Sequence, residues 1–160
     1  MRLMKYSKSL LLLIMILPWF SIPLLGKHSI NRFLPSAIFM SIVVSIVHMI
    51  AEKRKWWWWY VKLHPKLIGG LSFIAGPYFI GSIWILKFTY GEFRKFIFLN
   101  LLIDSLFTFV LIDWLKKLGI ASLVRLNKFQ LLIIFFIDSI LLYSFQYSIE
   151  KLLKVRTSKD

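Results

Sequence analysis

The sequence predicts an all-α protein, a polytopic bundle of five transmembrane helices, and three observations support this fold class. Five apolar segments, at residues 9–26, 33–51, 70–90, 96–115 and 131–149, are each about long enough to cross a bilayer. Hydrophobic residues make up 59% of the 160 residues and the mean hydropathy is +0.73, too apolar for a water-soluble domain of this length. No linker long enough to separate two domains interrupts the segments. We therefore expect residues 1–160 to form a single integral membrane domain.

The first segment follows the basic residues Arg2, Lys5 and Lys8, which is how a secretory signal begins. The apolar run ends in Pro18, Trp, Phe, Ser, Ile and Pro23, without the paired small residues that a signal peptidase prefers. We expect a retained membrane anchor that bends near one of the two prolines. If the segment is cleaved instead, four helices remain.

The second segment has one polar face. Ser41, Ser45, His48 and Glu52 recur at helical spacing, while the other faces carry Ile, Val, Phe and Met. We expect this face to pack inside the bundle. The alternative is an interfacial metal or acid–base site of His48, Glu52 and Asp113, which would lie on the same side of the membrane. A zinc site usually has three or four protein ligands, and this grouping offers few.

The connection after the second segment contains four consecutive tryptophans. Indole rings prefer the head-group layer, and four successive residues cannot share one helix face, so some must point toward lipid and others toward protein. We interpret the run as a lipid-interface anchor. A recognition site for an anionic lipid or a cationic ligand is the alternative, ahead of stacking on nucleic acid. The anchor residues are Trp56, Trp57, Trp58, Trp59 and Tyr60.

The third segment is rich in glycine and serine, which let helix backbones approach closely in a membrane. Gly76 and Pro77 predict a kink or a break, and a broken helix would expose backbone carbonyls to an ion. Lys87 lies about one turn from the end of this segment. Its side chain either snorkels to the interface or pairs with Asp104 of the next segment.

The fourth and fifth segments carry the most deeply placed charged residues. Asp104 and Asp138 each lie well inside an apolar run, and because consecutive helices are antiparallel, both are predicted near mid-membrane. Asn100, Asp104 and Thr108 recur every four residues and form one polar stripe. We predict an intramembrane polar site of Asp104, Asp138, Asn100 and Lys87. Its role is either hydrogen bonding between helices, with at least one carboxyl protonated, or a proton or cation pathway.

The formal net charge of +14 is spread over every connection and both tails rather than gathered in one patch. This distribution favours a bilayer with anionic head groups as the partner and argues against nucleic acid. Slightly more Lys and Arg residues fall on the side of the N-terminus, so we expect the N-terminus to be cytoplasmic. The basic C-terminal tail runs against this orientation.

Part of the chain resembles a group of small, uncharacterised multi-pass membrane proteins of endospore-forming Gram-positive bacteria. The likeness rests on Phe-Ile-Ala-Gly-Pro-Tyr-Phe-Ile-Gly at residues 73–81, Trp-Ile at 84–85, Asn100, Asp104, and Lys-Lys-Leu-Gly-Ile at 116–120. The resemblance implies a bacterial plasma membrane and supplies no activity or binding residues.

No motif for a known enzymatic reaction occurs, and the chain has no cysteine for a disulfide or a thiolate metal site. We expect no cofactor and no enzymatic activity, although scattered residues can still build an intramembrane enzyme. A non-enzymatic accessory or structural membrane protein is the favoured function. The alternative is a small transporter or ion-conducting protein that uses its intramembrane carboxylates. A homo-oligomer or a membrane protein partner is compatible with either function.

Overall fold

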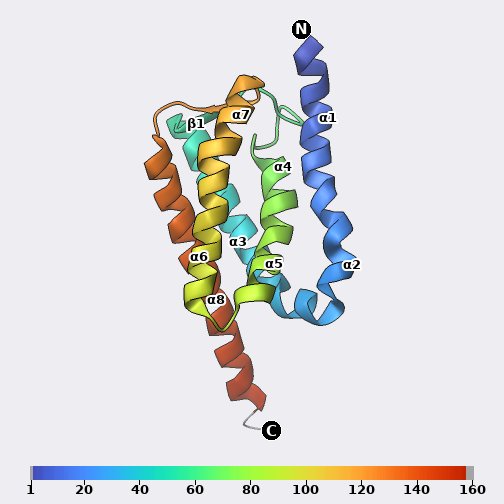
Figure 1. Ribbon diagram of the computed structural model, residues 1–160, viewed down its shortest axis with the longest axis vertical. Coiled ribbons are helices and arrows are strands. Elements are labelled where there is room, and N and C mark those ends of the chain that lie inside the picture. Colours follow the sequence, from blue (N-terminus) through green and yellow to red (C-terminus); the bar gives the residue numbers. More distant parts are fainter. Residues whose placement is uncertain (1, 158–160) are drawn as a thin grey trace.

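The computed structural model describes residues 2–157 as a bundle of five helices, each long and apolar enough to cross a membrane (Figure 1). Successive helices run in opposite directions, so the N-terminal end of the first and the C-terminal end of the last lie at opposite ends of the bundle. The first helix is built from α1 (Arg2–Ile16), η1 (Leu17–Ser21) and α2 (Ile22–Leu25), and the second is α3 (Lys27–Arg54). The third comprises α4 (Leu71–Phe73), η2 (Ile74–Tyr78) and α5 (Phe79–Thr89). The fourth comprises α6 (Phe93–Leu106), η3 (Phe107–Leu111) and α7 (Ile112–Lys117), and the fifth is α8 (Lys128–Thr157).

The turn between the first two helices is a single residue. Gly26 has a φ of +77°, a left-handed conformation that glycine adopts without the steric cost of a Cβ, and α3 begins at Lys27. The predicted segments 9–26 and 33–51 left residues 27–32 between them as a connecting loop. This prediction is wrong, because these residues are helical. Because Gly26 alone reverses the chain, Lys27 and Arg32 belong to the first turns of α3.

Three of the five helices contain a turn that departs from α-helical geometry. Pro18 lies at the start of the 3₁₀ turn Leu17–Ser21, and Pro77 lies inside the π-helical turn Ile74–Tyr78. A proline lacks the N–H that would continue the α-helical ladder, which accounts for irregular backbone at both positions. The third such turn, Phe107–Leu111, is also π-helical and contains no proline. Single π-helical turns are frequent at functional sites.

A two-stranded antiparallel sheet closes one end of the bundle. Strand β1 (Trp57–Trp59) follows α3 and pairs with β2 (Ala121–Leu123), which follows α7, so that Trp58 lies opposite Ser122. Helix α3 ends at Arg54, and the next residue, Lys55, adopts a left-handed conformation with a φ of 55°. In a bundle of five antiparallel spans, the connection after α3 and the connection after α7 are predicted on the same side of the membrane. They lie together at one end of the bundle (Figure 1).

Two clusters of buried apolar side chains divide the interior along its length. The cluster at the capped end includes Leu11, Trp57, Trp59, Phe73 and Leu115. The cluster at the opposite end includes Leu25, Phe33, Met40, Ile83 and Phe96.

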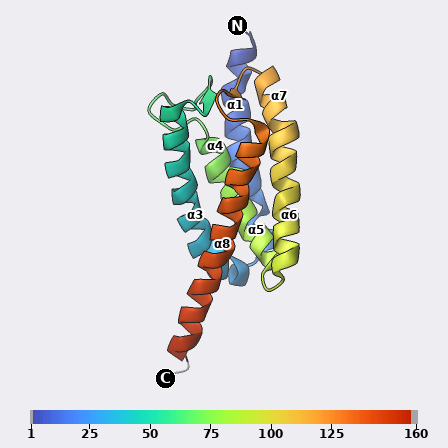
Figure 2. The ribbon, with the colours of Figure 1, turned by 90° about the vertical axis from the view of Figure 1, so that its left-hand side faces the viewer.

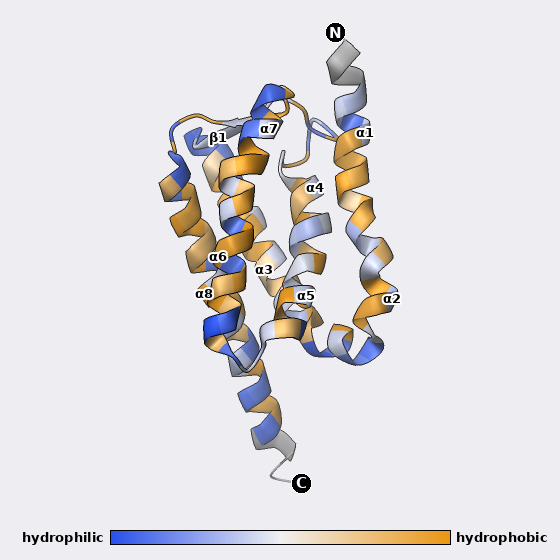
Figure 3. Ribbon diagram, viewed as in Figure 1, coloured by the Kyte–Doolittle hydropathy of each residue, from blue (hydrophilic) through white to orange (hydrophobic). Residues whose placement is uncertain are grey.

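Apolar residues run along each of the five helices (Figure 3), and many of their side chains are exposed on the outside of the bundle. Leu13, Phe20, Ile42 and Phe98 are among the large apolar side chains that point outward, with 56% to 76% of their surface exposed. Helix α8 is longer than its neighbours and extends beyond them at the end opposite the sheet (Figure 2). Its protruding part carries the exposed residues Lys151, Leu152 and Leu153.

Candidate functional site

A cavity of about 290 Å³ lies inside the bundle, directly beneath the two-stranded sheet. Side chains from α3, from the third and fourth helices and from α8 line it, and residues of β1 and β2 close it from above. Its wall is mainly aromatic and aliphatic, and the irregular turns η2 and η3 both contribute to it. The cavity thus lies between the fourth and fifth helices, which contribute the predicted polar residues Asn100, Asp104 and Asp138 to its lining.

Asp104 and Asp138 line this cavity from opposite helices. Asp138, on α8, is 6% exposed, and Asp104, on α6, is partly buried, while the neighbouring Ser139 hydroxyl donates to the Phe135 carbonyl over 3.0 Å. Tyr78 of η2 lines the same cavity. That the two carboxyl groups face one another across it stays a prediction.

The polar stripe on the fourth helix also faces inward. Asn100 lines the cavity and donates a hydrogen bond from Nδ2 to the Phe96 carbonyl over 2.8 Å. Thr108 is fully buried, and its hydroxyl has no hydrogen-bond partner among the described residues. Because a buried hydroxyl without a partner is costly, Thr108 is a weak point in the packing beside η3.

The roof of the cavity is formed by part of the tryptophan run. Trp57 and Trp59 are 7% and 5% exposed and line the cavity, whereas Trp58, on the opposite face of β1, is 41% exposed. The Trp57 indole N–H donates to Nδ1 of His48 over 3.2 Å. The alternation of a β-strand separates these rings, and the sequence prediction of rings pointing in different directions agrees with it. The anchor prediction is wrong for Trp57 and Trp59, because their rings are buried inside the protein. That Trp56, Trp58 and Tyr60 anchor the protein at the head-group layer stays a prediction.

His48, Glu52 and Asp113 do not form one site. The Glu52 carboxylate accepts hydrogen bonds from Lys62 Nζ over 2.8 Å and from the Gly69 backbone N–H over 2.7 Å, while His48 is bonded to Trp57. Asp113 forms a separate ion pair with Lys128 over 2.7 Å. Within residues 2–157, no group of three or more potential ligands is arranged to hold a metal ion. The sequence missed that Glu52 fixes the loop after β1, so the proposed grouping of these three residues is wrong.

Lys87 is not part of the carboxylate site either. Its ammonium group donates to the carbonyl oxygens of Leu24 and Leu25, over 3.0 and 3.2 Å, and lies 5.0 Å from the centre of the Trp84 ring. These carbonyls end α2, where a cation interacts favourably with the helix dipole. Of the two alternatives, the ion pair with Asp104 is not formed, because the ammonium group is bonded to the end of the first helix. Snorkelling of Lys87 to the interface stays a prediction.

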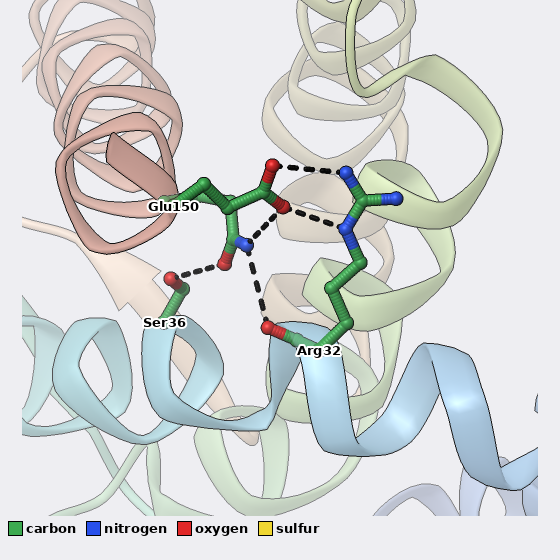
Figure 4. A network of polar contacts seen from close by, with 4 residues as sticks. Arg32, Ser36 and Glu150 are labelled. Atoms are coloured by element: carbon green, nitrogen blue, oxygen red, sulfur yellow. Dashed lines mark hydrogen bonds and ion pairs between the residues drawn. The ribbon is translucent and has the colours of Figure 1, made fainter. Parts of the chain in front are cut away.

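A polar network that the sequence did not predict joins α3 to α8 at the far end of the bundle (Figure 4). Arg32 donates from Nε and Nη2 to the two carboxylate oxygens of Glu150, over 2.6 and 2.9 Å. Gln146 is fully buried, accepts from the Ser36 hydroxyl over 2.6 Å, and donates to Glu150 over 3.0 Å. Burial, together with Glu150, raises the pKa of the neighbouring Tyr90 phenol to about 12. We call Arg32, Ser36, Gln146 and Glu150 the clamp.

A sequence signal for the clamp exists in the spacing of its members. Arg32 and Ser36 are four residues apart on one helix, and Gln146 and Glu150 are four apart on another, so each pair lies on one helix face. The assignment of Arg32 to a loop concealed this match.

Comparisons with protein-family models, with curated proteins and with solved structures found no match to this chain. The resemblance to membrane proteins of endospore-forming bacteria therefore stays a prediction. Any functional conclusion has to rest on the geometry of the cavity, the sheet and the clamp.

Proposed function

We propose that the chain is an integral membrane protein with five spans, located in a bacterial plasma membrane. The outward-facing Leu, Ile and Phe side chains support this location, because water-soluble proteins rarely expose continuous apolar surface of this extent. Helices of 19 to 28 residues in the five candidate spans have the length that a bilayer requires. We assign the N-terminus and the sheet to the cytoplasmic side of the membrane. The clamp then lies at the opposite side.

Within that membrane, the function that the geometry supports best is that of a small transporter for protons or other cations. The single observation that carries this proposal is the internal cavity lined by both Asp104 and Asp138. An ionisable side chain deep in a membrane is expensive and usually serves a pathway or a ligand. A purely structural pair of carboxyl groups would be expected to pack closely against partners, without an adjoining cavity of about 290 Å³.

In this proposal the carboxyl groups bind the transported cation, and the two ends of the bundle control access. Trp57 and Trp59 close the cavity on the side of the sheet, and the clamp holds α3 against α8 on the other side. A transporter opens its central site to one side at a time, and in this proposal the two ends of the bundle open in turn. The π-helical turns η2 and η3 flank the cavity and are the positions at which we expect the third and fourth helices to bend.

Flux measurements in liposomes test the proposal. The purified protein is reconstituted with a pH-sensitive dye inside, and a potassium gradient with valinomycin supplies the driving voltage. We expect Asp-dependent acidification that is lost in a protein carrying both Asp104→Asn and Asp138→Asn. Glu92→Gln is the matched control, because Glu92 pairs with Lys95 in an exposed position far from the cavity. Flux that is unchanged in the double variant would contradict the assignment of the carboxylates.

An accessory or structural role in a membrane complex is the second proposal, and one observation favours it. The protruding end of α8 exposes Leu152 and Leu153 next to basic residues, a combination that suits a helix contacting a partner or an anionic bilayer surface. Two results together would favour this role. The liposomes would show no flux, and a membrane protein would co-purify with the intact chain but not with a variant carrying Leu152→Ser and Leu153→Ser.

A further inference from the structure

We propose that the cavity binds an organic cation with a compact apolar body, of about the size of one aromatic ring and one quaternary ammonium group. This inference rests on the proposed transport function, because it names the substrate class of the same site. Charge, wall chemistry and volume each contribute one step.

The charge of the cavity favours a cation. Two carboxyl groups line it, and neither lysine nor arginine is among its lining residues in the described part of the chain. His48 adds no positive charge in this arrangement, since its Nδ1 accepts the Trp57 N–H and so carries no proton. An anion would enter a low-dielectric space that already holds acidic groups, which is unfavourable. A cation would instead offset the charge of an ionised Asp104 or Asp138.

The wall chemistry favours an organic cation over a bare metal ion. Rings of Trp57, Trp59, Phe73, Tyr78, Trp84 and Phe107 line the cavity, with aliphatic side chains between them. A small metal ion needs a shell of about six oxygen ligands, and a wall of this kind supplies few. Aromatic faces attract organic ammonium groups, which give up their water more readily.

The volume sets the size of the ligand. An apolar cavity of roughly 150 Å³ is large enough to hold benzene. The cavity of about 290 Å³ is nearly twice that size, so it has room for a ring and a trimethylammonium group. Benzyltrimethylammonium combines these two parts, and neopentylbenzene has the same shape without the charge.

Binding of these two compounds to the protein in lipid nanodiscs, measured by calorimetry, tests the inference. We expect benzyltrimethylammonium to bind at least about ten-fold more tightly than neopentylbenzene, because only the cation interacts with a carboxylate. Asp104→Asn and Asp138→Asn should each weaken the binding of the cation by about ten-fold, while Glu92→Gln leaves it unchanged.

Gly81 provides a variant that keeps both carboxyl groups. It lines the cavity, and a Cβ added there would meet no atom within 4 Å, so an alanine fits at this position without displacing a neighbour. We expect a leucine at the same position to fill part of the cavity. Gly81→Leu should abolish binding of the cation, and Gly81→Ala should retain most of it. The chain is not expected to unfold in either variant, which keeps the test valid even if an aspartate variant misfolds.

Equal binding of the two compounds, or cation binding that persists in Gly81→Leu, would overturn the inference. These results are distinguishable from a failure of the transport proposal. Proton flux without binding of benzyltrimethylammonium would refute the substrate class and leave transport in place. Binding of the cation without any flux would refute transport and leave the ligand site in place.

Discussion

Replacing each of two glycines on the third helix by alanine tests how closely that helix packs against the first. A Cβ at Gly76 would lie 2.6 Å from the carbonyl oxygen of Met15 and 2.8 Å from that of Ile14. Real Cβ atoms essentially never lie within 3.0 Å of such atoms, so Gly76→Ala has to push α1 away from η2. A Cβ at Gly81 would meet no atom within 4 Å. The two substitutions add the same methyl group to one helix, but Gly76 lies before Pro77 in the π-helical turn η2, whereas Gly81 lies in α5.

The difference between the two variants has a definite sign and size. Overpacking a close contact costs about 1–3 kcal/mol. Alanine is about 1 kcal/mol more favourable than glycine inside an α-helix, a gain that Gly81→Ala receives and that Gly76, before Pro77 in a π-helical turn, does not receive in full. Gly76→Ala should therefore be less stable than Gly81→Ala by at least about 1–3 kcal/mol. We expect Gly81→Ala itself to be at least as stable as the unmodified protein.

Reversible unfolding in mixed micelles of dodecyl maltoside and dodecyl sulfate, followed by circular dichroism, measures this difference. The midpoint for Gly76→Ala should lie at a lower fraction of dodecyl sulfate than the midpoint for Gly81→Ala. Coincident midpoints would refute the close packing of α1 against η2, and with it the position of the first helix in the bundle.

Three further predictions concern the clamp, the roof of the cavity and the orientation. Glu150→Gln should lower the free energy of unfolding by about 1–2 kcal/mol, because the Glu150 carboxylate accepts from two donors of the partly exposed Arg32. In the same assay, Glu92→Gln should lower it by less than about 0.5 kcal/mol, because both partners of that ion pair are exposed. Trp57→Phe should lower the free energy of unfolding by about 1–2 kcal/mol because it removes the hydrogen bond to His48, and Trp58→Phe should be nearly neutral. In variants that keep a single tryptophan, shallow lipid-attached quenchers should quench Trp58 and not Trp57. The reverse order would contradict the packing of β1. Single cysteines in the two loops that carry the sheet should resist an impermeant thiol reagent added to intact cells, and labelling of either loop from outside would reverse the orientation.

The sequence predicts most of the helical fold because its signal is local. About twenty mostly apolar residues indicate a candidate span whatever the rest of the chain does, and each of the five predicted segments lies largely within one of five helices. The inward face of the fourth helix was predictable for the same reason, since the spacing of Asn100, Asp104 and Thr108 is a property of one helix. Only the comparison of depths in two helices was needed to bring Asp104 and Asp138 together.

Contacts between distant parts of the chain were not predictable in this way. The pairing of β1 with β2 joins segments about sixty residues apart, and neither strand is long enough to show a periodic pattern. Lys87 has two possible partners at similar depth, and the choice depends on where α2 ends, which the single residue Gly26 decides. The clamp was missed for a related reason, because its arginine lies in a segment that the sequence assigned to a loop.

An electrical recording tests whether Asp104 and Asp138 carry an organic cation through the cavity. Liposomes containing the protein are adsorbed to a solid-supported membrane, and the current is recorded after a rapid jump in benzyltrimethylammonium concentration. We expect benzyltrimethylammonium to produce a current that persists in Glu92→Gln and is lost both in the double Asp→Asn variant and in Gly81→Leu. An equal current in the double Asp→Asn variant, or a wild-type current no larger than that of protein-free liposomes, would contradict it.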